Sequence, residues 1–283
     1  MNSNEYREQI RREIEGALGR SRPGLAGAPA ASVPESARQS LAVLGDPAQS
    51  AETRRAALQA LQQLSFNVKA FAAVRAEYIA VLRRIVDDPD AGLREGALET
   101  LAQEKDEFAQ RRLLAGLNRE EPPLVDDGKA IQFLAYDIHA DHFPAMRRLA
   151  QDAPDPDTRR EAVKALSADT DAADLLYRIF DDTREDEGVR QASASALLSV
   201  DPARFEQRAK QAVLDAGDAD SVRAAALTAL TYFANPAALA GDNQFMDGVS
   251  NVESAPTPAA IPNAESGGDL AKALRLFREK HGR

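Results

Sequence analysis

A short sequence pattern recurs through the middle of the chain, and it constrains the fold more than any other feature. Each copy has an anchor residue, a small residue three places later, an apolar residue four places later and Leu seven places later. The anchors are Arg54, Arg94, Asp127, Arg159, Arg190 and Arg223, of which Asp127 belongs to the weakest copy. Successive anchors lie 40, 33, 32, 31 and 33 residues apart. A period of this length is typical of stacked repeats, each of which is one supersecondary unit.

The spacing within each copy predicts a helix with one apolar stripe, because residues three, four and seven places apart share a helical face. The stripe ends on the equivalent leucines Leu61, Leu101, Leu134, Leu166, Leu197 and Leu230. A small side chain beside a large one on this stripe lets neighbouring helices approach closely. Acidic turns such as Asp88-Pro-Asp90 and Asp155-Pro-Asp157 precede most copies. Their Asp residues are suited to cap the helix that follows.

A second amphipathic stretch follows the first helix of the repeats. These stretches run from Val68 to Val86, Phe108 to Leu117, Phe143 to Ala150, Asp174 to Phe180 and Phe205 to Leu214. A helix pair of this length cannot bury its apolar face alone, so it is stabilised by stacking on its neighbours. The sequence therefore predicts an all-α, curved rod of about six helix pairs, with accessory helices at both ends.

The pattern Asp-Pro-Asp-x-x-Arg-x-x-Ala-Leu-x-x-Leu, followed by a second helix, resembles the HEAT repeat, particularly the bacterial subtype found in phycobilisome lyases. The resemblance covers residues 46–233. It implies a right-handed α-solenoid of the armadillo type, in which the first helices form the convex layer and the second helices line the concave side. It also implies that the turn acid of one unit meets the anchor of its neighbour. The expected structural ladder consists of Arg54, Arg94, Arg159, Arg190 and Arg223.

The third unit departs from the pattern in two ways. Asp127 reverses the charge of the anchor, and Pro122-Pro123 lengthens the preceding turn. Because the neighbouring units rely on a basic anchor, we expect a local kink or altered stacking at this unit.

The chain divides into four segments by composition. Residues 1–45 are expected to form N-terminal helices and a linker that cap the solenoid, and residues 46–246 the solenoid itself. Residues 247–268 have low hydrophobicity and several prolines, which predicts a disordered linker. Residues 269–283 are expected to form a basic amphipathic helix. This helix is either a C-terminal cap or a tethered recognition helix that docks in a groove of this protein or of a partner.

Composition and charge exclude several classes of function. The chain has no Cys, which removes disulfides, thiolate nucleophiles and zinc-thiolate sites. A net charge of −10 opposes binding to nucleic acid or to anionic membranes. No run of about 18 apolar residues occurs, so no membrane span is expected. From these features we expect a soluble, cytoplasmic protein.

Catalytic and metal-binding motifs are sparse. The sequence contains no Gly-Lys-Ser/Thr phosphate loop, no Gly-x-Ser-x-Gly and no Gly-x-Gly-x-x-Gly. His139 and His142 are the candidate metal ligands, because His-x-x-His can place two imidazoles on one side of a helical turn, with Asp137 and Asp141 nearby. This segment also coincides with a turn between helices, which favours solvated turn residues or caps. No cofactor is implied, and the chain is expected not to be an enzyme.

Arginines recur near the C-terminal ends of the second helices. The candidate partner-binding residues are Arg84, Arg112, Arg148, Arg178 and Arg208. On a concave surface they would form a basic stripe that binds an acidic peptide or protein surface, because guanidinium groups bind carboxylates bidentately. The alternative is structural, since cations favour helix C-termini and can pair with the acids that follow, such as Asp87, Asp152 and Asp181.

These observations predict a non-catalytic scaffold or adaptor that binds a protein or peptide through the concave face of the solenoid. The first alternative, from the resemblance, is an enzyme or chaperone of the bilin-lyase kind. The second is a nucleic-acid binder, which the net charge disfavours. The third is a subunit that uses its C-terminal helix to self-associate.

Overall fold

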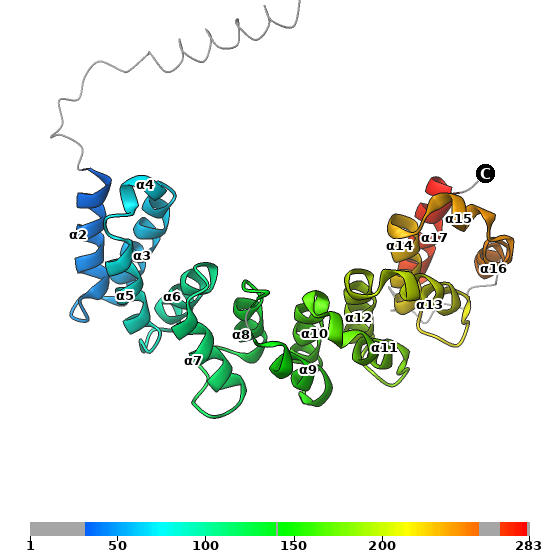
Figure 1. Cartoon of the computed structure of the whole chain (residues 1–283), viewed down its shortest axis with the longest axis horizontal. Helices are drawn as coiled ribbons and strands as arrows, with labels where there is room; N and C mark the ends of the chain where they lie inside the picture. The colour runs from blue at the N-terminus through cyan, green and yellow to red at the C-terminus, as the bar shows by residue number, and fades with distance from the viewer. Residues whose placement is uncertain (1–31, 140, 255–266, 282–283) are drawn as a thin grey trace, which may run out of the picture.

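The structure, a computed structural model, describes residues 32–139, 141–254 and 267–281. Figure 1 shows these residues as helices stacked side by side into an open curve. No strand occurs in the parts of the chain that are described. The predicted all-α solenoid is therefore confirmed. The first 31 residues of the N-terminal segment that is expected to cap the solenoid lie outside the described residues.

Two sets of helices alternate along the chain. The first helices, which follow the acidic turns, are α3 (Ala51–Ser65), α6 (Ala91–Gln103), α8 (Asp127–Leu134), α10 (Pro156–Ala165), α12 (Glu187–Val200) and α14 (Asp220–Phe233). The second helices are α5 (Arg75–Ile85), which is preceded by the short α4 (Val68–Phe71), α7 (Glu107–Leu117), α9 (Phe143–Asp152), α11 (Ala173–Asp181) and α13 (Pro202–Leu214). Two 3₁₀ turns, η1 (Leu166–Ala168) and η2 (Thr170–Ala172), connect α10 to α11.

Polar side chains begin most of the first helices. Ser50, Asp90, Asp126, Asp155 and Asp186 each accept a hydrogen bond from the backbone N–H three residues later. Each cap satisfies one of the N–H groups that have no partner within the helix. Side-chain caps therefore fix the start of five of the six first helices, and α14 begins without one.

The apolar stripe predicted from the sequence forms the core of the stack. The six equivalent leucines, Leu61, Leu101, Leu134, Leu166, Leu197 and Leu230, are at most 2% exposed. The small residues three places after each anchor are buried as well. Burial of one large aliphatic side chain contributes about 1.5–3 kcal/mol, so this regular stripe stabilises each repeat.

The repeats stack mainly through their first helices. Helix α3 packs on α6, α6 on α8, α8 on α10, α10 on α12 and α12 on α14. Figure 1 shows α6, α8, α10 and α12 along the inner side of the curve and α7, α9 and α11 along the outer side. The expectation that the second helices line the concave side is therefore wrong, because the first helices do so.

Small side chains lie where the first helices pack against one another. A Cβ added at Gly96 of α6 would lie 2.9 Å from the side chain of Leu58 of α3, so a larger residue here would force Leu58 to shift. Ala97 and Ala162 are also fully buried at small-residue positions of the first helices. The layer with the closer helix spacing becomes the inside of a curved stack, and the layer with the wider spacing becomes the outside.

The third repeat is built differently from its neighbours. Its first helix, α8, has only eight residues. Asp127 at the anchor position pairs with Arg119 at 2.5 Å. Arg119 has a φ of 61° and lies just after the end of α7. The charge reversal at the anchor is therefore balanced by an arginine within the preceding turn.

Four further helices complete the two ends of the stack. Helix α2 (Val33–Gly45) packs against α3, α4 and α5 at the N-terminal end. Helices α15 (Pro236–Gly241) and α16 (Asn243–Ser254) follow α14, and α17 (Gly267–His281) packs along α14. Residues 247–254 belong to α16, so the predicted disordered linker is wrong for this part. The rest of that predicted linker, residues 255–266, lies outside the described residues.

Helix α17 takes the place of a seventh first helix. Leu270, Ala273, Leu274 and Phe277 are buried and follow the same spacing as an anchor and its stripe. Nε2 of His281 lies 3.0 Å from the carbonyl oxygen of Thr231. The C-terminal ends of α17 and α14 therefore meet, as those of parallel first helices do. Within this chain, α17 acts as the cap of the solenoid.

Candidate functional site

The anchor arginines connect consecutive repeats. In three of them Nε donates to the carbonyl ten residues earlier, at the end of the preceding helix, in the pairs Arg54–Leu44, Arg190–Phe180 and Arg223–Val213. Three anchors also pair with an acid in the following turn, namely Arg54 with Asp88, Arg159 with Glu185 and Arg190 with Asp218. Arg94 donates to the carbonyl of Leu124, in the turn that precedes α8. Arg223 pairs within its own helix, with Asp220. These side chains are occupied by contacts within the protein.

The candidate partner-binding arginines lie on the second helices, and so on the outer layer. Three of them contact the end of the second helix of the preceding repeat, in the pairs Arg112–Asp87 at 2.6 Å, Arg148–Asn118 at 2.8 Å and Arg208–Asp181 at 2.7 Å. Arg112 also pairs with Glu121. Arg112 and Arg208 pair with acids at helix ends, which agrees with the structural alternative. These acids belong to the preceding repeat and not to the arginine's own repeat.

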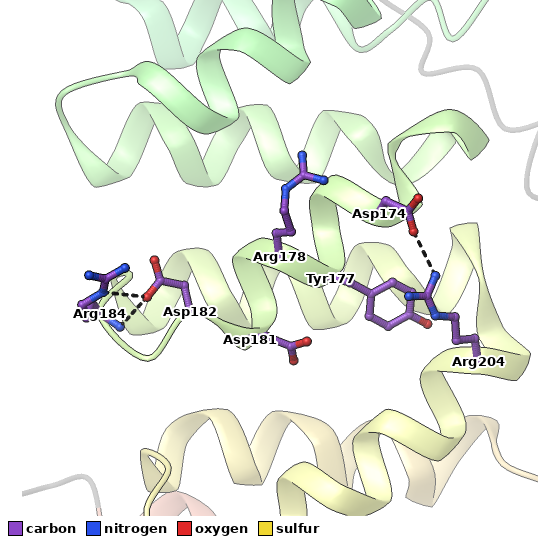
Figure 2. A pocket seen from close by; sticks show the side chains of 7 residues that line it. All are labelled: Asp174, Tyr177, Arg178, Asp181, Asp182, Arg184 and Arg204. Atoms are coloured by element: carbon purple, nitrogen blue, oxygen red, sulfur yellow. Dashed lines mark hydrogen bonds and ion pairs between the residues drawn. The ribbon is translucent and has the colours of Figure 1, made fainter.

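Arg178 and Arg84 complete this set of arginines. Neither guanidinium has a hydrogen bond or ion pair with another described residue. Arg178 borders an open hollow of about 630 Å³ on the outer layer. Figure 2 shows Arg178 and Asp174 on the same side of α11, and Tyr177 turned toward Arg204 of α13.

Charges of both signs line this hollow. Arg204 pairs with Asp174 at 3.0 Å, and its guanidinium carbon lies 4.0 Å from the ring centre of Tyr177. Burial raises the pKa of Tyr177 to about 12, so its phenol stays neutral. Three Asp and three Arg side chains line the hollow. The hollow is therefore not a purely basic binding site. We expect it to prefer an acidic group strongly only around Arg178.

The two candidate metal ligands differ in their surroundings. His142 precedes α9 and is 1% exposed, whereas His139 is exposed. Nδ1 of His142 has no hydrogen-bond partner among the described residues. Burial lowers the pKa of His142, against the opposing effect of Asp137 and Asp141. No group of three or more potential metal ligands occurs in the described ranges, so the structure gives no support for a metal site at this turn.

Residues five and nine places after each anchor lie on the exposed inner side of the first helices, which also carries Glu52 and Asp157 two places before their anchors. At about 100° per residue, these positions lie about 140° and 180° around the helix from the anchor, on the side away from the buried stripe. We call them the concave strip: Gln59, Gln63, Glu99, Gln103, Gln132, Tyr136, Lys164, Ala168, Ser195, Ser199, Thr228 and Tyr232. All twelve side chains are exposed.

The concave strip is poor in charge. Glu99 and Lys164 are its two charged members, although 28% of the whole chain is charged. Lys164 pairs with Glu161 of its own helix at 2.7 Å. The remaining members are amides, hydroxyls, tyrosines and one alanine. These groups offer hydrogen-bond donors and acceptors without the desolvation cost of a full charge.

Exposed apolar side chains gather at the C-terminal ends of some first helices. The exposed large apolar side chains of the described residues are Phe66, Val68, Tyr136, Ile138, Tyr232 and Phe233. All of them lie at the end of a first helix or just after it, in the first, third and sixth repeats. Phe66 is 86% exposed and Phe233 is 70% exposed. Phe233 also lines a small apolar cleft between α12, α13 and α14.

Comparison with known proteins agrees with this architecture. Residues 111–198, which run from α7 into α12, match the family described as HEAT repeats. This segment carries HEAT repeats. The phycobilisome-lyase subtype and a bacterial origin stay predictions from the sequence. No curated protein matches the chain.

The composition of the exposed face of the first helices can be read from the sequence, as can the arginine pattern of the second helices. Of the twelve residues at the fifth and ninth places after the anchors, two are charged. No helix of the described residues combines the length and hydrophobicity of a membrane span.

Proposed function

We propose that this HEAT-repeat protein is a non-catalytic scaffold that holds a segment of a partner protein on its concave face. The observation that carries the proposal is the charge-poor concave strip. The strip exposes two tyrosines beside amide and hydroxyl side chains, and exposed tyrosine is enriched in protein-binding surfaces.

The architecture supports the same conclusion. A solenoid offers a long regular surface, and each repeat contributes equivalent side chains to it. HEAT repeats commonly act as protein-interaction scaffolds, which makes a protein the expected class of partner. The outer arginines Arg84, Arg148 and Arg178 have no acidic partner within the described residues and form a second proposed contact, for acidic groups of the partner that extend beyond the concave face.

A selection experiment tests the proposal. Random peptides of about 20 residues displayed on phage are selected against the full chain, and the affinities of the selected peptides are measured by fluorescence anisotropy. We expect the double substitution Ser195→Arg and Thr228→Arg to weaken binding about ten-fold or more, equivalent to about 1.4 kcal/mol, because it places two unpaired charges in the concave strip.

The matched control is the double substitution Arg111→Glu and Arg184→Glu, at two exposed arginines that belong to neither proposed contact. The outer variant, Arg148→Glu and Arg178→Glu, tests the second proposed contact. Peptides that bind equally well to the concave variant would contradict the proposal. Loss of binding in the outer variant alone would instead assign the function to the arginines.

A further inference from the structure

Contacts between consecutive second helices recur along the outer layer. Asp181 at the end of α11 pairs with Arg208 of α13, and Asn118 just after α7 accepts a hydrogen bond from Arg148 of α9. Asn118 and Asp181 each lie nine residues before the anchor of the following first helix. This place therefore supplies the acceptor for an arginine of the next second helix.

Helix α2 occupies the position of a second helix at the N-terminal end of the stack. It packs against α3 and α5. The carbonyl of Leu44 in α2 accepts from Nε of the anchor Arg54, as the carbonyl of Phe180 in α11 accepts from Arg190. In α2, the residue nine places before the anchor is Gly45. Glycine has no side-chain acceptor, so α5 lacks the contact that α9 and α13 receive at this place.

The arginine beside Gly45 is Arg84 of α5. A Cβ added at Gly45 would lie 3.8 Å from Nη2 of Arg84, so the guanidinium lies next to the place that a side chain would fill. Asp46, the next residue, already accepts from the backbone N–H of Ala48 and from the amide of Gln49. Arg84 has no hydrogen bond or ion pair with another described residue. Its donors are therefore free to bind an acceptor from outside the chain.

An open hollow of about 440 Å³ adjoins this guanidinium, and we call it the Arg84 hollow. Both oxygens of Asp87, one of its two acids, accept from Arg112. Asp88, the other acid, pairs with Arg54 at 2.7 Å. Because these charges are neutralised, the unpaired guanidinium gives the hollow a local preference for an anion. The uncharged lining residues are Gly45, Pro47, Val81, Ile85 and Pro89.

We infer that the Arg84 hollow binds an acidic side chain of a partner protein. The carboxylate of an Asp or Glu residue lies beside Gly45 and forms with Arg84 the kind of pair that joins other second helices. Pro47 and Pro89 are exposed at the hollow and contact the apolar part of the bound segment. This inference rests on the second contact of the proposed function, and it names the position and the chemistry of that contact.

A subtractive peptide selection tests the inference. Random peptides displayed on phage are first depleted on the Gly45→Asp variant and then selected on the unsubstituted full chain. Gly45→Asp supplies its own carboxylate to Arg84, so the peptides that remain should share an Asp or Glu residue. Changing that acid to its amide in a synthetic peptide should weaken binding to the unsubstituted chain about ten-fold. The same change should have no effect on binding to the Arg84→Gln variant.

Gly45→Ala is the matched control for the substitution in the chain. Its methyl group would make an ordinary van der Waals contact with Arg84 and Val81 and brings no acceptor, so peptide binding should stay unchanged. Arg111→Glu is the control for charge, since Arg111 is an exposed arginine of α7 outside the hollow. It should likewise leave binding unchanged.

The outcomes separate the inference from the rest of the proposed function. The inference is overturned when no selected peptide distinguishes the unsubstituted chain from Gly45→Asp, or when the amide weakens binding equally in Arg84→Gln. A phosphoserine that binds more than ten-fold tighter than the acid would assign the hollow to phosphate and overturn the carboxylate. Peptides that require Arg84 but ignore Ser195→Arg and Thr228→Arg would instead contradict the concave contact and support the inference.

Discussion

The guanidinium of Arg190 and the carboxylate of Asp218 face each other with N–O distances of 2.5 and 2.7 Å. Both side chains are almost completely buried, at 3% and 4% exposure. Nε of the same guanidinium donates to the carbonyl oxygen of Phe180. One side chain thus joins the end of α11, the start of α12 and the turn before α14.

Removing Arg190 should destabilise the solenoid strongly. Arg190→Ala leaves the carboxylate of Asp218 and the carbonyl of Phe180 buried without their partner, and losing one member of a buried pair costs about 3–5 kcal/mol. The measurement is the free energy of unfolding from denaturant titration. Arg184→Ala is the control, because its pair with Asp182 is exposed and should leave stability unchanged. Equal stability of the two variants would show that the buried pair contributes nothing.

Small residues on the first helices should be required for stacking. Ala162 is fully buried at the small-residue position of α10. We expect Ala162→Leu to lower the free energy of unfolding by about 1–3 kcal/mol, because added methylenes force apart a close-packed interface. Ala168→Leu is the matched control, since Ala168 belongs to the exposed concave strip. A neutral result at Ala162 would mean that the helices have room between them.

The sequence predicted the repeats well because their stripe is a local property. Leu61 and its five equivalents follow from spacings of a few residues, which a single helix imposes. The direction of curvature is not local, because it depends on how closely neighbouring layers pack across repeats. Gly96 is an example, because the need for a small residue at this position is apparent only from its contact with Leu58 of another helix.

The candidate site likewise combines features that local spacing shows with features that depend on contacts between repeats. The arginines of the second helices were identified by their regular spacing, but their partners depend on distances between repeats. Asp87 and Arg112 are 25 residues apart, and no local pattern indicates that they meet. Helix α17 was also predicted only as a basic amphipathic helix, since its identity as a seventh first helix requires its parallel packing on α14.

Helix α17 should protect the end of the solenoid. Phe277 is buried, and its ring centre lies 6.1 Å from that of Phe245 in α16. We expect Phe277→Asp to release α17, because a charge cannot be buried there without a partner. Amide hydrogen exchange in α14 should then increase. The exposed apolar face of α14 should also promote self-association in light scattering.

Arg275→Asp is the control for this change, since Arg275 is exposed on the outer face of α17. It introduces the same side chain into the same helix and should leave both exchange and size unchanged. Unaltered exchange in α14 of the Phe277→Asp variant would contradict the role of α17 as a cap.

His142 should make the stability of the third repeat depend on pH. Burial holds the pKa of His142 below its ordinary value of 6.5 in the folded chain. The unfolded chain therefore binds a proton more readily, and the stability that neutral His142 provides at pH 7 is lost as the pH falls below about 6.5. His142→Gln should reduce the loss of thermal stability between pH 7.5 and 5.5, because Gln does not titrate. His139→Gln is the matched control and should follow the unsubstituted chain, since His139 is exposed. Identical pH profiles for both variants would show that His142 does not titrate in this range.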